Sequence, residues 1–195
     1  MSLEYGSVAD FVIGQLSKLN PVIVSFYIVT AAALAWALIL RSALGDGWTI
    51  ARVLPYTLAG LVAVPLLLIP VHEGIHILVF SLLGGRDIRI GADLRNFMIY
   101  VTAHRHVVGS GRFLTIALSP MIVISSAFLA AILFLPPQWK WSLALALMAH
   151  TTMCAGDVAM AAFYWSNRAR RLLTWDDADK KIAYFYEEIK PITNQ

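Results

Sequence analysis

The sequence contains few charged residues and only one cysteine. Aspartate, glutamate, lysine and arginine make up 14% of its 195 residues, whereas a soluble domain typically contains about a quarter. Hydrophobic residues make up 59%, so the composition excludes an ordinary soluble domain and predicts a membrane protein. The single Cys154 excludes an internal disulfide. The first residues lack a basic segment leading directly into a short apolar run, so we expect no signal peptide.

Long hydrophobic stretches occur four times along the chain. A helix needs about twenty residues to cross a hydrocarbon core of about 30 Å. We therefore predict an all-α polytopic membrane protein with four transmembrane helices. The second stretch contains Pro55, Pro65 and Pro70 and predicts a kinked or two-part helix. The four predicted spans are 21–40, 53–83, 113–135 and 139–165.

The basic residues predict how the chain is oriented. Four spans place 1–20, the segment between the second and third spans, and 168–195 on one side. Most of the 15 lysines and arginines lie there, so the positive-inside rule predicts cytoplasmic termini. We expect an N-terminal interfacial segment (1–20), a membrane domain (21–167) and a cytoplasmic tail (168–195), with lipid as the surroundings and no nucleic-acid partner. The other side holds only Arg41, Arg52 and Lys140.

Two segments outside the spans match a helix-capping pattern. Ser7 and Asp10 precede apolar residues spaced along one helical face, which predicts a short interfacial helix. Thr174 and Asp177 repeat the pattern ahead of apolar residues in the tail. We predict a short helix in both places and assign neither a function.

The segment between the second and third spans predicts β-structure. Residues alternate in polarity around Ile88 and Ile90, and 96–102 is rich in β-forming residues. We predict a short strand or hairpin on the cytoplasmic side, with at least one edge unpaired.

Three ionisable residues lie inside the second hydrophobic stretch. A charged group near the centre of a bilayer costs roughly 2.5–3.5 kcal/mol on insertion scales, so it needs a partner or a function. On a helix, His72 and His76 share one face and Glu73 stands beside them. Two imidazoles one turn apart can bind zinc, and the glutamate can take a proton from a zinc-bound water. The alternatives are helix–helix hydrogen bonding or a degenerate site.

A catalytic zinc site needs a third protein ligand. The candidates in the fourth stretch are His150, Cys154 and Asp157, of which Asp157 is the only acid. With the predicted topology, His76 and Asp157 both lie roughly 13–17 Å from the cytoplasmic boundary. We therefore predict His72, His76 and Asp157 as the ligands. Alternatively, Asp157 relays protons or forms a hydrogen bond, Cys154 is a small hydrophobe, and His150 is a supporting group, an oxyanion donor or a buried core histidine.

These features together resemble the site-2-protease type of intramembrane metalloprotease. The chain is most similar to a small prokaryotic membrane family called "putative zincin peptidases". The resemblance covers roughly 59–186 and implies zinc bound by His72, His76 and Asp157, Glu73 as the catalytic base, a prokaryotic cell membrane, and β-structure that presents the substrate. It rests on His72-Glu73-Gly74-Ile75-His76, Ala117-Leu118-Ser119-Pro120 and Ala155-Gly156-Asp157.

The sequence also departs from the site-2 pattern. Gly156 precedes Asp157, whereas in that pattern the glycine follows the aspartate. Ser119-Pro120 lacks the following asparagine, so the oxyanion-stabilising group is unassigned. No regulatory module of the PDZ or CBS type fits in this length.

The leading hypothesis is a zinc metalloendopeptidase of the H-E-x-x-H type, acting within the membrane on a protein or peptide substrate. Zinc would activate the water, and Glu73 would act as general base. One alternative is another membrane enzyme, such as a lipid hydrolase or a di-iron desaturase; the latter type uses many more histidines than the five present. A second is a non-catalytic protein with a structural metal site, which would not require Glu73. The sequence does not specify an oligomeric state.

Overall fold

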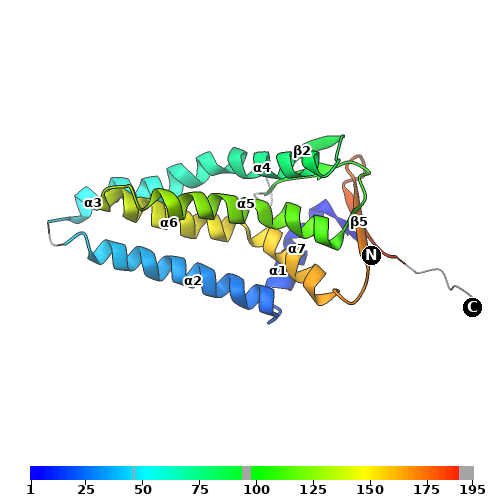
Figure 1. The fold of residues 1–195 in the computed structure, drawn as a ribbon, viewed down its shortest axis with the longest axis horizontal. Helices are drawn as coiled ribbons and strands as arrows, with labels where there is room; N and C mark the ends of the chain where they lie inside the picture. Colours follow the sequence, from blue (N-terminus) through cyan, green and yellow to red (C-terminus); the bar gives the residue numbers. More distant parts are fainter. Residues whose placement is uncertain (46, 94–97, 189–195) are drawn as a thin grey trace, which may run out of the picture.

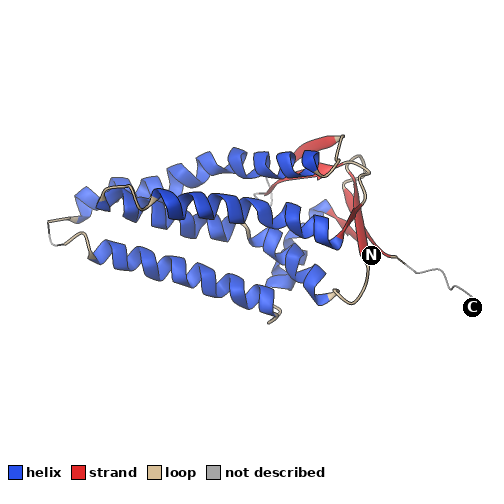
Figure 2. Cartoon of the chain, viewed as in Figure 1, coloured by secondary structure: helices blue, strands red, loops and turns tan. Residues whose placement is uncertain are grey.

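A bundle of long helices makes up most of the molecule, and the strands gather at one end of it. The computed structural model describes all residues except 46, 94–97 and 189–195. Figure 2 shows the helices running lengthwise and the strands beside the N-terminus. The bundle also contains the 3-10 turn η1 (Tyr5–Ser7) and the π-helical η2 (Ala59–Ala63). The α-helices are α1 (Val8–Leu16), α2 (Pro21–Ser42), α3 (Ile50–Leu58), α4 (Val64–Leu82), α5 (Ser110–Ala131), α6 (Pro137–Met153) and α7 (Ala155–Ser166).

The described strands form two antiparallel sheets. The larger has the order β1-β6-β5-β4, and the smaller pairs β2 with β3, Ile88 lying opposite Ala103. The prediction that the chain contains strands in addition to its helices is confirmed. The sequence did not predict the four-stranded sheet. The strands are β1 (Ser2–Glu4), β2 (Ile88–Asp93), β3 (Met98–Ala103), β4 (Val108–Gly109), β5 (Leu172–Asp177) and β6 (Ile182–Glu187).

The predicted tail helix is wrong, because β5 and β6 form a hairpin there. Leu172 and Thr174 are buried in β5 and Phe185 is buried in β6, which is the two-residue period of a half-buried strand. Trp175 and Tyr184 lie opposite each other, and their rings stack with centroids 4.7 Å apart. Cross-strand packing therefore prevails over the capping pattern. Near the N-terminus, α1 is helical as predicted, although the Ser7 side chain makes no capping hydrogen bond.

Three described helices are long and apolar enough to cross a membrane. They are Pro21–Ser42, Ile50–Leu82 and Ser110–Ala131, and α6 with α7 makes a fourth if this pair, bent by 48°, is one span. The predicted fourth span is thus broken at Cys154 rather than continuous. The number of membrane crossings and the orientation of the termini stay predictions.

The predicted irregularity in the second span is a π-helical segment. The η2 segment joins α3 to α4 in one helical run of 33 residues. Gly60 within it packs against α6, and a Cβ added there would lie 2.2 Å from the Ser142 carbonyl oxygen. Glycine is therefore required by this close approach.

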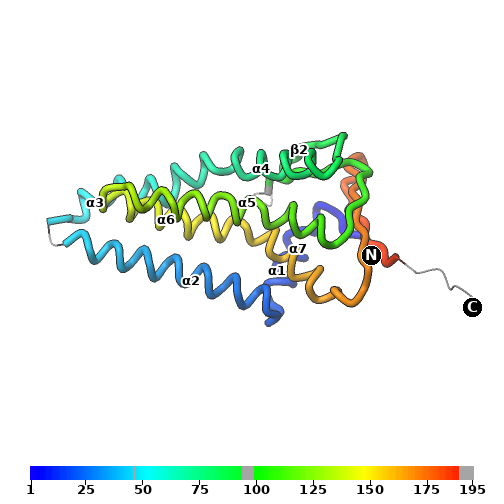
Figure 3. The backbone as a smooth tube through the Cα atoms, viewed as in Figure 1, coloured from blue at the N-terminus to red at the C-terminus, as the bar shows by residue number. Residues whose placement is uncertain are grey.

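The α6 helix runs through the middle of the bundle. In Figure 3 its tube lies between α2 and the neighbouring α4 and α5. Ala144 and Ala146 are fully buried in it, and small side chains of this kind allow helices to approach closely. The α7 helix continues toward the strands, where Tyr164 packs with Leu3 and Phe185. The bent α6–α7 pair thus carries Asp157 into the interior.

Candidate metal centre

The α4 helix places two histidines at the wall of a partly open cavity. His72 and His76 lie one turn apart and are buried, with ring centroids 4.9 Å apart. Glu73 follows His72 on the same helix and lines the same cavity. The i, i+4 spacing in the sequence therefore produces the expected common face.

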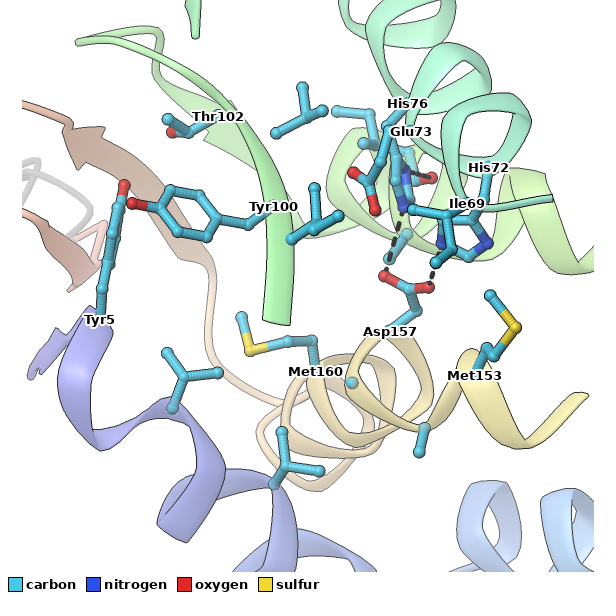
Figure 4. Close-up of a pocket in the computed structure, with 18 of the residues that line it drawn as sticks. Tyr5, Ile69, His72, Glu73, His76, Tyr100, Thr102, Met153, Asp157 and Met160 are labelled. Atoms are coloured by element: carbon cyan, nitrogen blue, oxygen red, sulfur yellow. Dashed lines mark hydrogen bonds and ion pairs between the residues drawn. The ribbon is translucent and has the colours of Figure 1, made fainter. Parts of the chain in front are cut away.

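The α7 helix supplies the carboxylate that faces these histidines. Asp157 lies in the first turn of α7, directly after the break at Cys154. The His72 Nε2 atom lies 3.2 Å from Asp157 Oδ2, and the His76 Nε2 atom lies 3.4 Å from Asp157 Oδ1. The three donor atoms lie within 4.8 Å of one another, and Figure 4 shows the carboxylate beneath both rings. The structure brings the three predicted ligands together.

Glu73 offers a test of whether this cluster fits a metal ion. Its Oε2 atom is buried and has no hydrogen-bond partner among the described residues. A buried carboxylate oxygen without a partner is unfavourable, because its lost hydration is not replaced. A divalent cation held by the adjacent donors, with its water, would supply the missing partner. Two imidazoles and a carboxylate are also the donor types that zinc accepts in catalytic sites.

The outer ring nitrogen of His76 is held by a backbone carbonyl. Its Nδ1 atom lies 3.1 Å from the Ile116 carbonyl oxygen. A carbonyl only accepts hydrogen bonds, so Nδ1 carries a proton, and in the neutral imidazole this leaves Nε2, on the side of Asp157, as the nitrogen that can bind a metal. Pro120 explains why this carbonyl lacks its usual helical partner, because proline has no N–H to bond four residues back. The Ser119-Pro120 motif therefore has a structural role that the sequence analysis did not assign.

The outer nitrogen of His72 faces a third histidine. His72 Nδ1 lies 3.4 Å from His150 Nε2, and His150 is fully buried. If His72 Nδ1 donates this hydrogen bond, its Nε2 is free for a metal and His150 carries its proton on Nδ1. That Nδ1 atom has no partner among the described residues. Of the roles considered for His150, the geometry favours support of His72.

His72, His150 and Cys154 form a second group of donor atoms within 4.8 Å. His150 and Cys154 are completely buried and do not line the cavity. A catalytic metal needs an open position for water, and of these two clusters only the one with Asp157 has all three of its residues on the cavity wall. Cys154 is therefore better described as a buried small side chain.

Substitutions of His150 and Cys154 test which of the two donor groups binds zinc. We expect His150→Phe to lower zinc affinity about 10- to 100-fold, as is typical when the hydrogen-bond partner of a ligand is removed. Cys154→Ala should leave the affinity unchanged. Competition with a chromophoric chelator measures both values. If Cys154→Ala releases zinc while Asp157→Ala retains it, the metal belongs to the buried group instead.

A third donor group, consisting of His104, Asp177 and Asp179, lies among the strands. Arg89 Nη1 donates to Asp179 Oδ1 at 2.6 Å. The hydrogen bond and charge of Arg89 hold the pKa of Asp179 below its usual range. The Ala178 amide donates to His104 Nδ1. These donors already have partners, so we assign no metal to them.

The cavity beside the candidate metal centre has a volume of about 800 Å³. The lining residues come from β1, η1, α1, η2, α4, β3, α5, α6, α7, β5 and β6. The strand β3 passes close to the side chains of His72, His76 and Asp157 (Figure 4). Most lining residues are apolar. A second polar group in it, which the sequence analysis missed, consists of Tyr5, Tyr100, Thr102 and Asp176.

The chain was compared with models of protein families. The model described as "Putative zincin peptidase" matches residues 65–171. This range contains His72, Glu73, His76 and Asp157, and it ends before β5. No curated protein and no solved structure matches the chain.

Proposed function

Because the chain belongs to the putative zincin peptidase family, we propose that it is a zinc-dependent endopeptidase cleaving membrane-embedded or membrane-proximal peptide bonds. One observation carries this proposal. Two imidazole nitrogens and both oxygens of Asp157 converge beside the unpartnered carboxylate oxygen of Glu73, at the wall of a large cavity. The apolar helices around the site support a membrane setting.

In this proposal His72, His76 and Asp157 hold the zinc. When bound, zinc polarises water and the scissile carbonyl group. Glu73 accepts the proton of the attacking water at its carboxylate and then donates it to the leaving nitrogen. The Ile116 carbonyl and His150 keep His76 and His72 in the tautomers that leave Nε2 unprotonated. The apolar lining limits the access of bulk water.

The strand β3 is suited to hold an extended substrate. Its residues 99–102 all line the cavity. Alternate side chains point to opposite faces of a sheet, so four consecutive lining residues indicate that the strand borders the cavity along its edge. No described strand pairs with β3 itself on the side away from β2, where β5 joins only beyond the end of β3, at the bridge between His104 and Asp176. A substrate chain could add there as a further strand, which would also unwind its helix.

The register identifies which amide groups face this free edge. The His104 amide donates to the Asp87 carbonyl directly opposite, at 2.8 Å. Hydrogen-bonded and non-hydrogen-bonded pairs alternate along an antiparallel ladder, so Thr102 and Tyr100 bond toward β2. The N–H groups of Val101 and Ile99 therefore point toward the free edge.

A proline substitution tests this edge. We expect Val101→Pro to lower kcat/KM roughly two- to tenfold, the equivalent of one backbone hydrogen bond, because proline deletes the donor. Zinc content and thermal stability should change little. Val101→Thr is the matched control, since it retains the N–H and favours a strand. Equal cleavage by the two variants would contradict strand addition.

The substrate can be sought in cells. Membrane proteomes of cells with the wild type and with Glu73→Gln should differ in one or more membrane proteins that accumulate uncut in the variant. New amino termini in the wild type, mapping within or next to predicted spans, would identify the cleavage sites. Accumulation of an altered lipid, with no altered protein, would favour a lipid hydrolase instead.

A further inference from the structure

A second polar cluster lies in the same cavity as the candidate metal centre. Tyr5 from η1, Thr102 from β3 and Asp176 from β5 all line this cavity. Figure 4 shows Tyr100 and Thr102 on the side of β3 that faces Tyr5, away from His72 and Asp157. The ring of Tyr100 packs edge-on against that of Tyr5, with centroids 4.8 Å apart. Three segments distant in the sequence therefore build one polar wall.

The hydroxyl groups of Tyr5 and Thr102 in this wall complete no hydrogen bond to a described residue, although both lie close to the Asp176 carboxyl. Tyr5 is 8% exposed and Thr102 is 4% exposed. Both hydroxyl oxygens are buried, and neither completes a hydrogen bond to a described residue. Both nevertheless lie near enough to the Asp176 carboxyl to influence its protonation. Buried polar groups without partners are unusual in native proteins, and they point to a ligand.

The acidic side chain in this wall, Asp176, also lacks a described basic partner. Asp176 forms no ion pair with a described lysine, arginine or histidine, and no described lining residue is a lysine or an arginine. Burial raises the pKa of its carboxyl group, and the Thr102 and Tyr5 hydroxyls oppose that shift. Arg105 donates its backbone amide to the Asp176 carbonyl. A carboxylate with two hydroxyl groups is a complete set of acceptors for one cationic group.

We propose that Asp176, Tyr5 and Thr102 form a specificity subsite for a lysine or arginine side chain of the substrate. This inference rests on the proposed peptidase function and names the substrate feature that the cavity selects. The carboxylate binds the cationic head, and the two hydroxyl oxygens accept its remaining hydrogen bonds. A zinc ion at the metal centre offsets the charge of Asp157, so Asp176 remains available for a cation from the substrate.

The position of the subsite follows from the free edge of β3. Neighbouring strands place directly opposite residues on the same face. A substrate residue opposite Thr102 or Tyr100 thus projects toward Tyr5 and Asp176, whereas its neighbours project to the other face. The basic residue is therefore selected at alternate positions of the bound segment.

The test measures binding separately from cleavage. The probes are neutral, extended peptides that carry one lysine, or one norleucine, at each position in turn. Norleucine keeps the aliphatic chain and removes the charge. Binding is measured by fluorescence anisotropy on detergent-solubilised Glu73→Gln protein, and cleavage on the protein with Glu73 intact. We expect lysine at one position, or at positions two residues apart, to bind about 10- to 100-fold more tightly than norleucine.

The same binding measurement is then made with Asp176→Asn added. The lysine preference should disappear while the norleucine peptide binds as before. Glu187→Gln is the matched control, since this exposed residue of β6 does not line the cavity. Tyr5→Phe provides a milder second variant and should reduce the preference only in part. A preference that survives Asp176→Asn, or no binding of either peptide, would overturn the subsite.

The two proposals fail differently in this design. Cleavage without any lysine preference supports the peptidase function and overturns the subsite. A lysine preference that depends on Asp176, without cleavage by the protein carrying Glu73, supports the subsite as a binding site and contradicts the peptidase function.

Discussion

Replacing Glu73 with glutamine should abolish peptide cleavage and leave zinc bound. The amide keeps the size of the side chain but cannot accept a proton from water. General base catalysis contributes about 10²- to 10⁴-fold to a rate, so kcat should fall by that factor. Glu73 Oε2 has no partner among the described residues, and removing its charge should therefore leave the fold intact. Turnover of a substrate from the proteomic comparison, with the zinc content of the same sample, measures both effects.

Two controls make this result interpretable. Glu4→Gln removes an exposed carboxylate from β1 that does not line the cavity, and it should retain full activity. Thermal unfolding of both variants should match that of the wild type. A Glu73→Gln protein that cleaves at the normal rate would exclude Glu73 as the base.

Removing any of the three proposed ligands should release the zinc. We expect His72→Ala, His76→Ala and Asp157→Ala each to lower zinc affinity by more than the roughly 10- to 100-fold typical of losing a ligand's hydrogen-bond partner. A catalytic site with three protein ligands has no spare donor. Zinc content by mass spectrometry and competitive chelation measure the loss. Chelation of the wild type should stop cleavage, and added zinc should restore it.

The third donor group, among the strands, offers a matched control for this prediction. His104 belongs to the donor group among the strands, and His104→Ala should leave zinc content unchanged. Zinc lost from Glu73→Gln but fully retained in Asp157→Ala would reverse the roles of base and ligand. Full retention in Asp157→Ala alone would leave the third ligand to be found elsewhere.

Local sequence patterns predict much of this candidate site. The spacing of His72 and His76 requires only a helix, and α4 is helical over both. The position of Asp157 requires more, because it depends on two spans lying side by side at equal depth. An isolated acid in an apolar stretch is costly unless it has a partner. That cost, combined with the predicted topology, is sufficient to place Asp157 near the histidines.

Features that depend on contacts between distant segments are harder to predict. The tail has the capping pattern of a helix, but pairing with β1 and β4 makes it part of a sheet. The break at Cys154 has no proline or glycine at the position itself, although Gly156 follows closely. Tyr5 and Asp176 lie near opposite ends of the sequence, and only the sheet brings them to one wall. By contrast, the effect of Pro120 can be predicted from the sequence. Proline has no N–H to donate to the Ile116 carbonyl, so this carbonyl can accept a hydrogen bond from His76.

Some of the residues that line the cavity lie within the range matched by the family model, and others lie outside it. The three proposed metal ligands and β3 lie within 65–171, whereas Tyr5 and Asp176 lie outside that range. Chemistry and substrate selection would then be carried by separable stretches of sequence. Evolution could exchange the terminal segments and redirect the enzyme to new substrates without altering its reactive centre. The same division would let an engineer retarget the protein by grafting chain ends onto an unchanged helical core.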